Sequence, residues 1–265
     1  MSADPSKPQS DALQATAPTR PLAQTAASVP VERATIASKQ ALRAELRARR
    51  QAMAPRCGTA QAREAGEHLA DVLEPLLDWA QVRTAGVYAA VGHELDLGPL
   101  SQRLVSRGLR TCYPRVASQN PPRLHFVAVT DASDLVVAPF GLREPAPQAP
   151  PLPLSAIDVF FVPGLGFDRQ GQRLGQGRGY YDAALREHPA ALRVGVCHPC
   201  QELSAVPCEP HDERMDLVVT PLGCVTVSGR SRHRLLRAVC ESVVPGVLDV
   251  TEPSGTACQK TEVKP

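Results

Sequence analysis

The chain has 265 residues, of which 43% are hydrophobic and 21% are charged, and its formal net charge is +2. This length allows one large or two small domains with a buried core, and so mild a charge creates no strong field toward nucleic acid or membrane surfaces. No stretch reaches the roughly 20 apolar residues of a membrane span, and eight cysteines without a secretory signal indicate reduced thiols. We therefore expect a cytoplasmic globular enzyme or binding protein that contacts neither nucleic acid nor membrane.

The N-terminal residues 1–33 are rich in Pro, Ser, Thr, Ala and Gln and hold few large apolar side chains. Such a segment buries too little surface to offset its ordering entropy, so it is expected to be a disordered extension. A transit peptide is a weaker alternative, because Asp4 and Asp11 are acidic and Arg20 is the only arginine before residue 33.

A helix is predicted over residues 39–53, with Ser38 as its N-cap. Its cations follow one another at intervals of four, four and three residues and form one basic stripe: Lys39, Arg43, Arg47 and Arg50. A run of this kind is more often a solvated helix face than a binding site.

The next elements are a second amphipathic helix over residues 59–77 and a short buried strand over residues 84–91. Glu94 follows that strand and precedes a helix over residues 97–107. Ligands of open α/β sheets bind outside the carboxyl ends of strands. Glu94 therefore stands where a functional carboxylate is expected, although acids also cap turns at such places.

Further strands are predicted over residues 110–116, 124–129, 159–162, 192–196 and 217–220, with a helix from about residue 180 to 188. Strands that alternate with helices favour an α/β domain whose largely parallel sheet is covered on both faces.

The stretch 158–182 reads DVFFVPGLGFDRQGQRLGQGRGYYD and joins a buried strand to a glycine-dense loop and a helix start. Glycines let backbone N–H groups converge on an anion, and Arg173 and Arg178 in the loop are cations suited to phosphate oxygens. The loop nevertheless matches neither the P-loop nor the dinucleotide spacing. The residues alone leave an anion site and a structural loop equally open.

The twenty-residue string PGLGFDRQGQRLGQGRGYYD closely resembles the signature of 5-formyltetrahydrofolate cyclo-ligases, also called 5,10-methenyltetrahydrofolate synthetases. SKQALRAELRARR, CYPRV and FGLREP resemble other fragments of that family, and the similarity extends over about residues 37–226. It implies a single three-layer α/β/α domain over residues 34–227 with a mostly parallel central sheet. Residues 228–265 would then be a basic, later polar, mostly disordered tail.

The resemblance implies ATP- and Mg²⁺-dependent ring closure of 5-formyltetrahydrofolate to 5,10-methenyltetrahydrofolate, with release of ADP and phosphate. ATP would phosphorylate the formyl oxygen to an iminophosphate (a formyl-phosphate intermediate), and N10 would then displace phosphate, so no side chain serves as covalent nucleophile. The expected partner is the folate substrate alone, and the expected assembly is a monomer or a weak homodimer.

The resemblance also assigns residues. Glu94, Arg115, Tyr180 and Tyr181 are expected to bind folate, and Asp182 and Asp216 to hold Mg²⁺. Glu144 is placed near the site without a chemical role, His211 and Asp212 in a loop-orienting role, and Arg47 and Arg50 stay undecided. Arg178 departs from the family, whose members carry Lys or Gly there. Residues expected to contact ATP are Lys39, Arg43, Arg173, Leu174, Gly175, Gln176, Gly177, Arg178, Gly179, Tyr180 and Tyr181.

Three alternatives remain. Cys197, Cys200, Cys208 and His211 have zinc-ligand spacing, and the first two also have redox spacing. The glycine loop also suits a nucleotide-binding protein with another phosphate acceptor. The basic residues 229–237 suit a nucleic-acid binder, although such runs are usually solvated.

Overall fold

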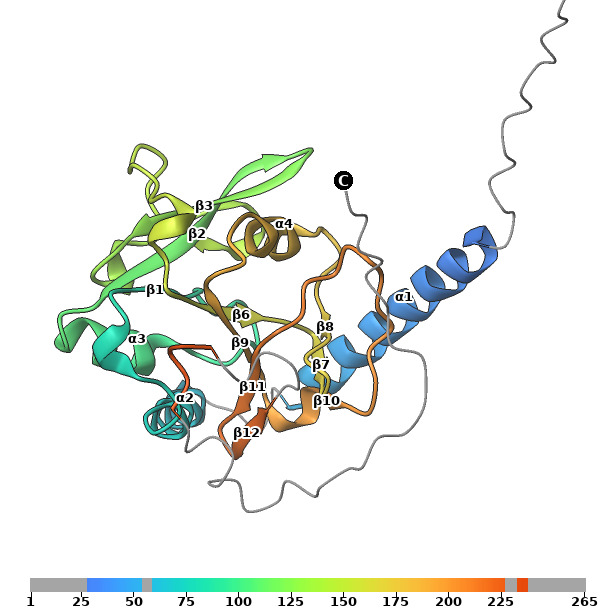
Figure 1. The fold of residues 1–265 in the computed structure, drawn as a ribbon, viewed down its shortest axis with the longest axis horizontal. Coiled ribbons are helices and arrows are strands. Elements are labelled where there is room, and N and C mark those ends of the chain that lie inside the picture. The colour runs from blue at the N-terminus through green and yellow to red at the C-terminus, as the bar shows by residue number, and fades with distance from the viewer. Residues whose placement is uncertain (1–27, 54–58, 227–232, 238–265) are drawn as a thin grey trace, which may run out of the picture.

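The computed structural model describes residues 28–53, 59–226 and 233–237, with α1 along one side of a central sheet (Figure 1). Seven strands form this sheet in the order β12-β11-β9-β6-β1-β2-β3. The five inner strands are parallel, and only the two edge strands are antiparallel to their neighbours. The mostly parallel sheet is thus confirmed. Its strands are β1 (Thr84–Gly86), β2 (Arg110–Gln119), β3 (Pro122–Ala128), β6 (Val159–Pro163), β9 (Leu192–Val196), β11 (Leu217–Thr220) and β12 (Gly223–Thr226).

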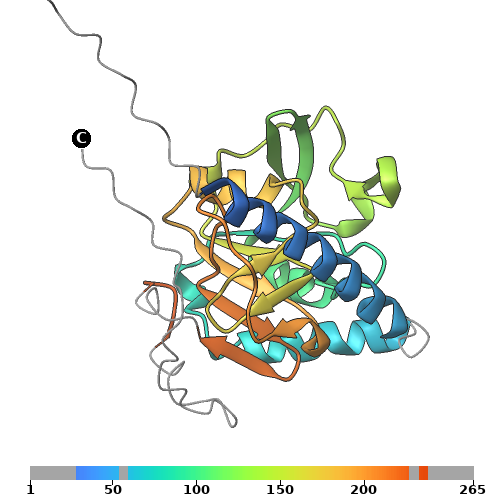
Figure 2. The ribbon, with the colours of Figure 1, turned by 90° about the vertical axis from the view of Figure 1, so that its right-hand side faces the viewer.

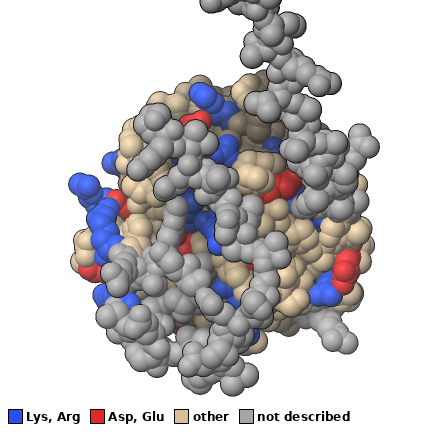
Figure 3. Space-filling view, turned by 45° about the vertical axis from the view of Figure 1, so that its right-hand side comes forward, with Lys and Arg blue, Asp and Glu red and all other residues tan. Residues whose placement is uncertain are grey.

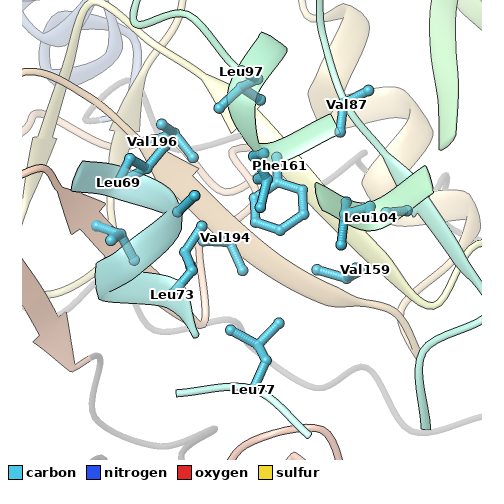
Figure 4. Packing of buried hydrophobic residues seen from close by; sticks show 14 of the residues in the cluster. Leu69, Leu73, Leu77, Val87, Leu97, Leu104, Val159, Phe161, Val194 and Val196 are labelled. Atoms are coloured by element: carbon cyan, nitrogen blue, oxygen red, sulfur yellow. The ribbon is translucent and has the colours of Figure 1, made fainter. Parts of the chain in front are cut away.

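Helices cover both faces of the sheet, as the α/β/α prediction requires. The helices α2 (Thr59–Leu73) and α3 (Gly98–Ser106) pack on one face, where Leu69 and Leu104 join one hydrophobic cluster (Figure 4). The helix α4 (Tyr180–Glu187) packs on the other face, where Leu185 joins a second cluster.

The central strand β6 explains why both clusters form. Its apolar run is buried along its whole length, and successive side chains of a strand point to opposite faces. Phe161 accordingly lies in the cluster beneath α2 and α3, and Phe160 in the cluster beneath α4. A fully buried side chain of this size contributes about 1.5–3 kcal/mol to folding.

The long helix α1 (Ser28–Met53) lies against a separate small sheet, and Figure 2 shows it crossing that side of the molecule. This sheet has the order β10-β7-β8, and its strands β7 and β8 come from the glycine-dense stretch. Leu46 of α1 is buried among Leu165, Leu174 and Val206. Packing thereby places the basic face of α1 beside the glycine loop. The bounds are β7 (Gly166–Asp168), β8 (Arg173–Leu174) and β10 (Glu202–Leu203).

Short elements complete the fold. A two-stranded sheet pairs β4 (Val136–Val137) with β5 (Arg143–Glu144). Single 3₁₀ turns span Trp79–Gln81, Ala132–Asp134, Pro139–Gly141, Leu154–Ala156 and Pro199–Gln201. In the part of the chain that is described, no helix is both long and apolar enough to cross a membrane.

Several predicted boundaries are wrong. The helix α1 begins at Ser28 instead of residue 39, so residues 28–33 are helical; Pro30 falls in its first turn, where proline is tolerated. The helix α2 ends at Leu73 because Pro75 lacks the N–H that a continuing helix needs. The strand β1 ends at Gly86, and the following residues leave the sheet to form a wall of the site described below.

Part of the predicted C-terminal tail is ordered. Leu235 is fully buried, its carbonyl accepts from Asp78 N at 2.8 Å, and Arg237 N donates to Leu76 O at 3.0 Å. Residues 233–237 therefore belong to the domain. The remainder of the 228–265 prediction, and residues 1–27 of the predicted extension, lie outside the described residues.

Candidate active site

A cavity of about 870 Å³ opens at the carboxyl ends of β1 and β6. The chain segments that leave these two strands line it together with the β2–β3 hairpin, α1 and the loop before β11. This is the edge at which open α/β sheets bind ligands. On the face drawn in Figure 3, the visible Lys and Arg side chains are interspersed with Asp and Glu, which agrees with the mild net charge.

The glycine loop and α1 form one wall of the cavity. Arg43 Nε donates to Gly175 O at 3.0 Å, and Arg47 Nη2 donates to Gln176 Oε1 at 2.9 Å. Gly177 has a φ of +98°, and a Cβ there would lie 3.3 Å from Arg43 Cζ. Only glycine therefore suits this close approach of loop and helix. Gly179, with a φ of +69°, precedes the first turn of α4, whose N–H groups favour anions.

Lys39 is buried in the same wall and binds two acids from the loop before β11. Its Nζ donates to Glu209 Oε2 and to Asp212 Oδ2, and Glu209 N donates to Asp212 Oδ2 at 2.7 Å. His211 lies beside them, with its Nε2 3.8 Å from Glu209 Oε2. A metal ion could be held by three or more His, Cys, Asp or Glu side chains whose ligand atoms lie close together. Among the described residues, the one such group is Glu209, His211 and Asp212, whose ligand atoms lie within 4.8 Å of one another.

Asp182, in the first turn of α4, is held by Arg173. Arg173 Nη2 lies 2.9 Å from both oxygens of the carboxylate, and Glu213 N donates to Asp182 Oδ1 at 3.2 Å. Burial pushes the pKa of Asp182 upward, but the Arg173 charge and these hydrogen bonds outweigh it, so the pKa is lowered. The predicted phosphate ligand Arg173 is therefore already engaged, with its side chain only 5% exposed.

A second part of the cavity lining, the Glu94 end, lies around Glu94. Glu94 Oε2 accepts from Val91 N at 3.1 Å, and Glu94 Oε1 lies 3.8 Å from Arg50 Nη1. Burial raises the pKa of Glu94, although Val91 N and Arg50 act in the opposite direction. Burial also raises the pKa values of Tyr88 and Tyr181, which the Glu94 charge raises further. Around Glu94, burial therefore outweighs the nearby Arg50 charge.

The structure brings most of the sequence-predicted residues together at this cavity. Glu144 also lines it, and its Oε1 accepts from Val116 N at 3.3 Å. The predicted residues that line the cavity are Lys39, Arg43, Glu94, Arg173, Leu174, Gly175, Gln176, Gly177, Arg178, Gly179, Tyr180, Tyr181 and Asp182.

Two predicted residues, Arg115 and Asp216, lie outside the cavity lining. Arg115 Nη1 donates to Ala146 O and, at 3.1 Å, to Ala149 O, so its guanidinium holds the proline-rich loop instead of facing a ligand. Asp216 is 1% exposed, and its Oδ2 accepts from Arg193 N at 2.8 Å. Asp216 therefore does not line the cavity that Asp182 lines.

The acids that do face the cavity with Asp182 are Glu209 and Asp212. Sequence reasoning did not single out Glu209 and gave Asp212 only a loop-orienting role. The available signal was a pair of acids three residues apart on the loop that leads into β11, near the family motif around His211. Their carboxylates are hard oxygen donors that fit Mg²⁺, whereas Asp216, buried and bound to backbone, does not fit it.

The zinc or thiol alternative loses its geometric basis. Cys197 is buried, and Cys200 and Cys208 are half-buried. Burial raises the pKa of the Cys197 and Cys200 thiols, which disfavours the thiolate that metal binding and redox chemistry need. Within the described part of the chain, these cysteines do not join His211 in a group of metal-ligand atoms.

Comparison with known proteins gives one consistent result. The model of the 5-formyltetrahydrofolate cyclo-ligase family matches residues 35–221. The chain is 33% identical to the 5-formyltetrahydrofolate cyclo-ligase of Escherichia coli over 179 residues, which is 66% of this chain and 96% of the relative. It is 39% identical to the Mycolicibacterium smegmatis 5-formyltetrahydrofolate cyclo-ligase over 146 residues, or 52% and 74% of the two chains.

Solved structures agree with the sequence match. The 5,10-methenyltetrahydrofolate synthetase of Aquifex aeolicus superposes with a TM-score of 0.61 and 26% identity, covering 72% of this chain and 93% of that one. The synthetase of Mycoplasma pneumoniae, at 21% identity and a TM-score of 0.53 over 69% and 98% of the chains, shares the fold. The chain belongs to the 5-formyltetrahydrofolate cyclo-ligase family of enzymes.

Proposed function

We propose that this protein closes the ring of 5-formyltetrahydrofolate to 5,10-methenyltetrahydrofolate at the expense of ATP, with Mg²⁺ present. The formyl oxygen attacks the γ-phosphorus, ADP leaves, and an iminophosphate forms on N5. The lone pair of N10 then attacks the formyl carbon, the C–O bond breaks, and phosphate departs. N10 loses its proton in the process, and the product carries the methenyl cation.

One observation carries this proposal: a single cavity is lined both by the glycine loop with its cations, the phosphate end, and by the buried carboxylate of Glu94 near Tyr88 and Tyr181. The reaction needs two ligands with their reacting atoms in contact, and positioning of that kind supplies most of the catalysis in phosphoryl transfer. Family membership supports the same assignment of substrates.

At the phosphate end, the glycine loop and the first turn of α4 would present N–H groups, and Lys39, Arg43 and Arg178 would present cations. Mg²⁺, when bound, supplies charge neutralisation on the phosphates, and Asp182, Glu209 and Asp212 would hold it. In this structure Lys39 forms ion pairs with two of these acids. Binding of the nucleotide would therefore require Lys39 to exchange carboxylate partners for phosphate oxygens.

At the other end, Glu94 would accept hydrogen bonds from N–H groups of the pterin, and Tyr180 and Tyr181 would offer flat apolar surface. N10 and the formyl carbon belong to the same molecule, so the ring closure is intramolecular. It requires only a substrate conformation in which N10 lies close to the formyl carbon. The protein contributes orientation and exclusion of water, which protects the iminophosphate from hydrolysis.

The test is the absorbance of the methenyl product after purified protein is mixed with 5-formyltetrahydrofolate, ATP and Mg²⁺. The proposal expects a rise that requires ATP and yields one ADP per methenyl group. Tight ATP binding without this rise would favour the second candidate, a nucleotide-binding protein that phosphorylates another acceptor. Cytoplasmic location, the monomeric or weakly dimeric state and the absence of nucleic-acid or membrane partners stay predictions.

A further inference from the structure

Arg50 is the cation that reaches the Glu94 end of the cavity from α1. Its side chain is 11% exposed and lines the cavity, whereas the neighbouring Arg49 is exposed and pairs with Glu45 on the surface. The Nη1 atom of Arg50 is buried and has no hydrogen-bond partner among the described residues. A buried donor without a partner destabilises a folded protein, so such an atom in a cavity calls for an explanation.

The pair with Glu94 does not satisfy this donor. The distance of 3.8 Å from Arg50 Nη1 to Glu94 Oε1 exceeds hydrogen-bond length, and the hydrogen bond of Glu94 goes through its other oxygen to Val91 N. The Tyr181 hydroxyl is likewise buried without a hydrogen-bond partner in the described residues. Arg50 Nη1, a donor without a partner in the described residues, thus lies 3.8 Å from an acceptor, Glu94 Oε1, and a rotation of the Arg50 side chain would turn the donor toward a ligand in the cavity.

We infer that Arg50 and Glu94 together read the lactam edge of the pterin ring. The exocyclic 4-oxo group would accept from Arg50 Nη1, and the adjacent N3–H would donate to Glu94 Oε1. The lactam places an acceptor beside a donor, which is the complement of the arginine–carboxylate pair. Arg50 is thereby a specificity-determining residue that selects 4-oxo over 4-amino pterins, because arginine donates hydrogen bonds and accepts none.

This inference rests on the proposed folate substrate and deepens it. Phosphate binding alone does not account for the Arg50 geometry, because the acid it faces is Glu94 and not one of the acids around Lys39. Glutamine at position 50 would turn its amide to donate or to accept, so it would serve either ligand.

The experiment compares two ligands by calorimetry without ATP at pH 8. One is 5-formyltetrahydrofolate, and the other is its 4-amino-4-deoxy analogue, in which an amino donor replaces the oxo acceptor and N3 carries no proton. We expect the wild type to bind the 4-oxo ligand at least about 100-fold more tightly, and Arg50→Gln to reduce this ratio by about 10- to 100-fold. The matched control Arg49→Gln should keep the wild-type ratio.

Both ligands are measured on one preparation, so the ratio does not depend on the fraction of folded protein. Arg50→Lys, which also only donates, should retain the 4-oxo preference. The inference is overturned if the wild-type ratio is below about tenfold, if Arg50→Gln leaves the ratio unchanged, or if Arg50→Lys abolishes it. If the wild type binds 5-formyltetrahydrofolate not at all, the proposed function fails too; if it binds but the ratios contradict the expectation, only the role of Arg50 fails.

Discussion

The two ends of the cavity differ in how their charges are satisfied. At the phosphate end, Lys39 binds Glu209 and Asp212, and Arg173 binds Asp182, so these cations and acids neutralise one another. At the Glu94 end, Arg50 Nη1 has no hydrogen-bond partner in the described part of the chain. If ATP binds as proposed, the first end would have to exchange these partners, whereas a folate bound as proposed would supply a partner to the Arg50 donor. We therefore expect nucleotide binding to break more ion pairs of the site than folate binding does.

The largest expected effect is a loss of activity on substitution of Asp182, and it distinguishes Asp182 from Asp216, the other predicted Mg²⁺ ligand. Asp182→Asn should lower kcat by about 100- to 1,000-fold and raise the Mg²⁺ concentration for half-maximal activity, because a cavity carboxylate and the partner of Arg173 are lost. Asp216→Asn is the matched control, because its amide oxygen can still accept from Arg193 N. An Mg²⁺ titration of both variants decides. A raised requirement in Asp216→Asn alone would reverse the assignment.

The next effect follows from the proposed exchange of the Lys39 partners, from carboxylates to phosphate oxygens. Lys39→Met should raise the KM for ATP by about 10- to 100-fold, since it removes a phosphate ligand and leaves two acids without their cation. The KM for folate should change by less than about twofold, because the ion pairs of Lys39 in the described residues are with Glu209 and Asp212 and not with Glu94. Initial rates with each substrate varied in turn provide the measurement, with Arg49→Gln as control. Equal rises in both KM values would mean that the two ends do not act separately.

Arg178 is exposed at the rim of the phosphate end, so its contribution should be smaller. Arg178→Ala should raise the KM for ATP by about three- to tenfold, because water screens an exposed charge. Arg169→Ala, whose arginine pairs with Glu202 away from the cavity, is the control. A KM that stays at the wild-type value would remove Arg178 from the nucleotide site.

The smallest effects concern stability and have opposite signs at the two ends. The pKa of Glu94 is raised by folding from its usual value of 4.5. Glu94 therefore contributes to the free energy of unfolding at pH values below 4.5, and this contribution is lost as the pH rises through the folded-state pKa. Glu94→Gln should therefore raise Tm at pH 7 and have little effect near pH 4. The pKa of Asp182 is lowered by folding from its usual value of 3.8. Asp182 therefore stabilises the folded protein at pH values above 3.8, and this stabilisation is lost as the pH falls through the folded-state pKa. Asp182→Asn should lower Tm at pH 7, with a difference that shrinks in acid.

Calorimetric scans of both variants between pH 3 and pH 8 measure these differences. Tm shifts of the same sign at pH 7 would contradict the electrostatic contrast between the ends.

Local features of this protein could be predicted from its sequence because neighbouring residues determine them. The buried run of β6, the glycine loop and the start of α4 are consecutive, and each carries a pattern of its own. Every predicted residue of this loop lines the cavity. The order of the strands, by contrast, follows from packing, although their alternation with helices was enough to predict a mostly parallel sheet.

The remaining site residues depend on contacts between distant segments. Lys39 and its acids are separated by at least 170 residues, so no spacing rule connects them. Asp216 and Arg115 have suitable side chains, but their direction depends on Arg193 and on the proline-rich loop. A sequence pattern predicts which residue type stands at a strand end, but it does not predict the hydrogen-bond or ion-pair partner of that side chain.

The central claim is that ATP phosphorylates the formyl oxygen within this cavity. The most direct measurement is a single turnover with 5-formyltetrahydrofolate carrying ¹⁸O in the formyl group, followed by mass analysis of the released phosphate. If the formyl oxygen is phosphorylated before ring closure, the label appears in inorganic phosphate, one atom for each methenyl group formed. Label that appears in water, with unlabelled phosphate, would show that ATP hydrolysis and ring closure are separate events and would contradict the iminophosphate.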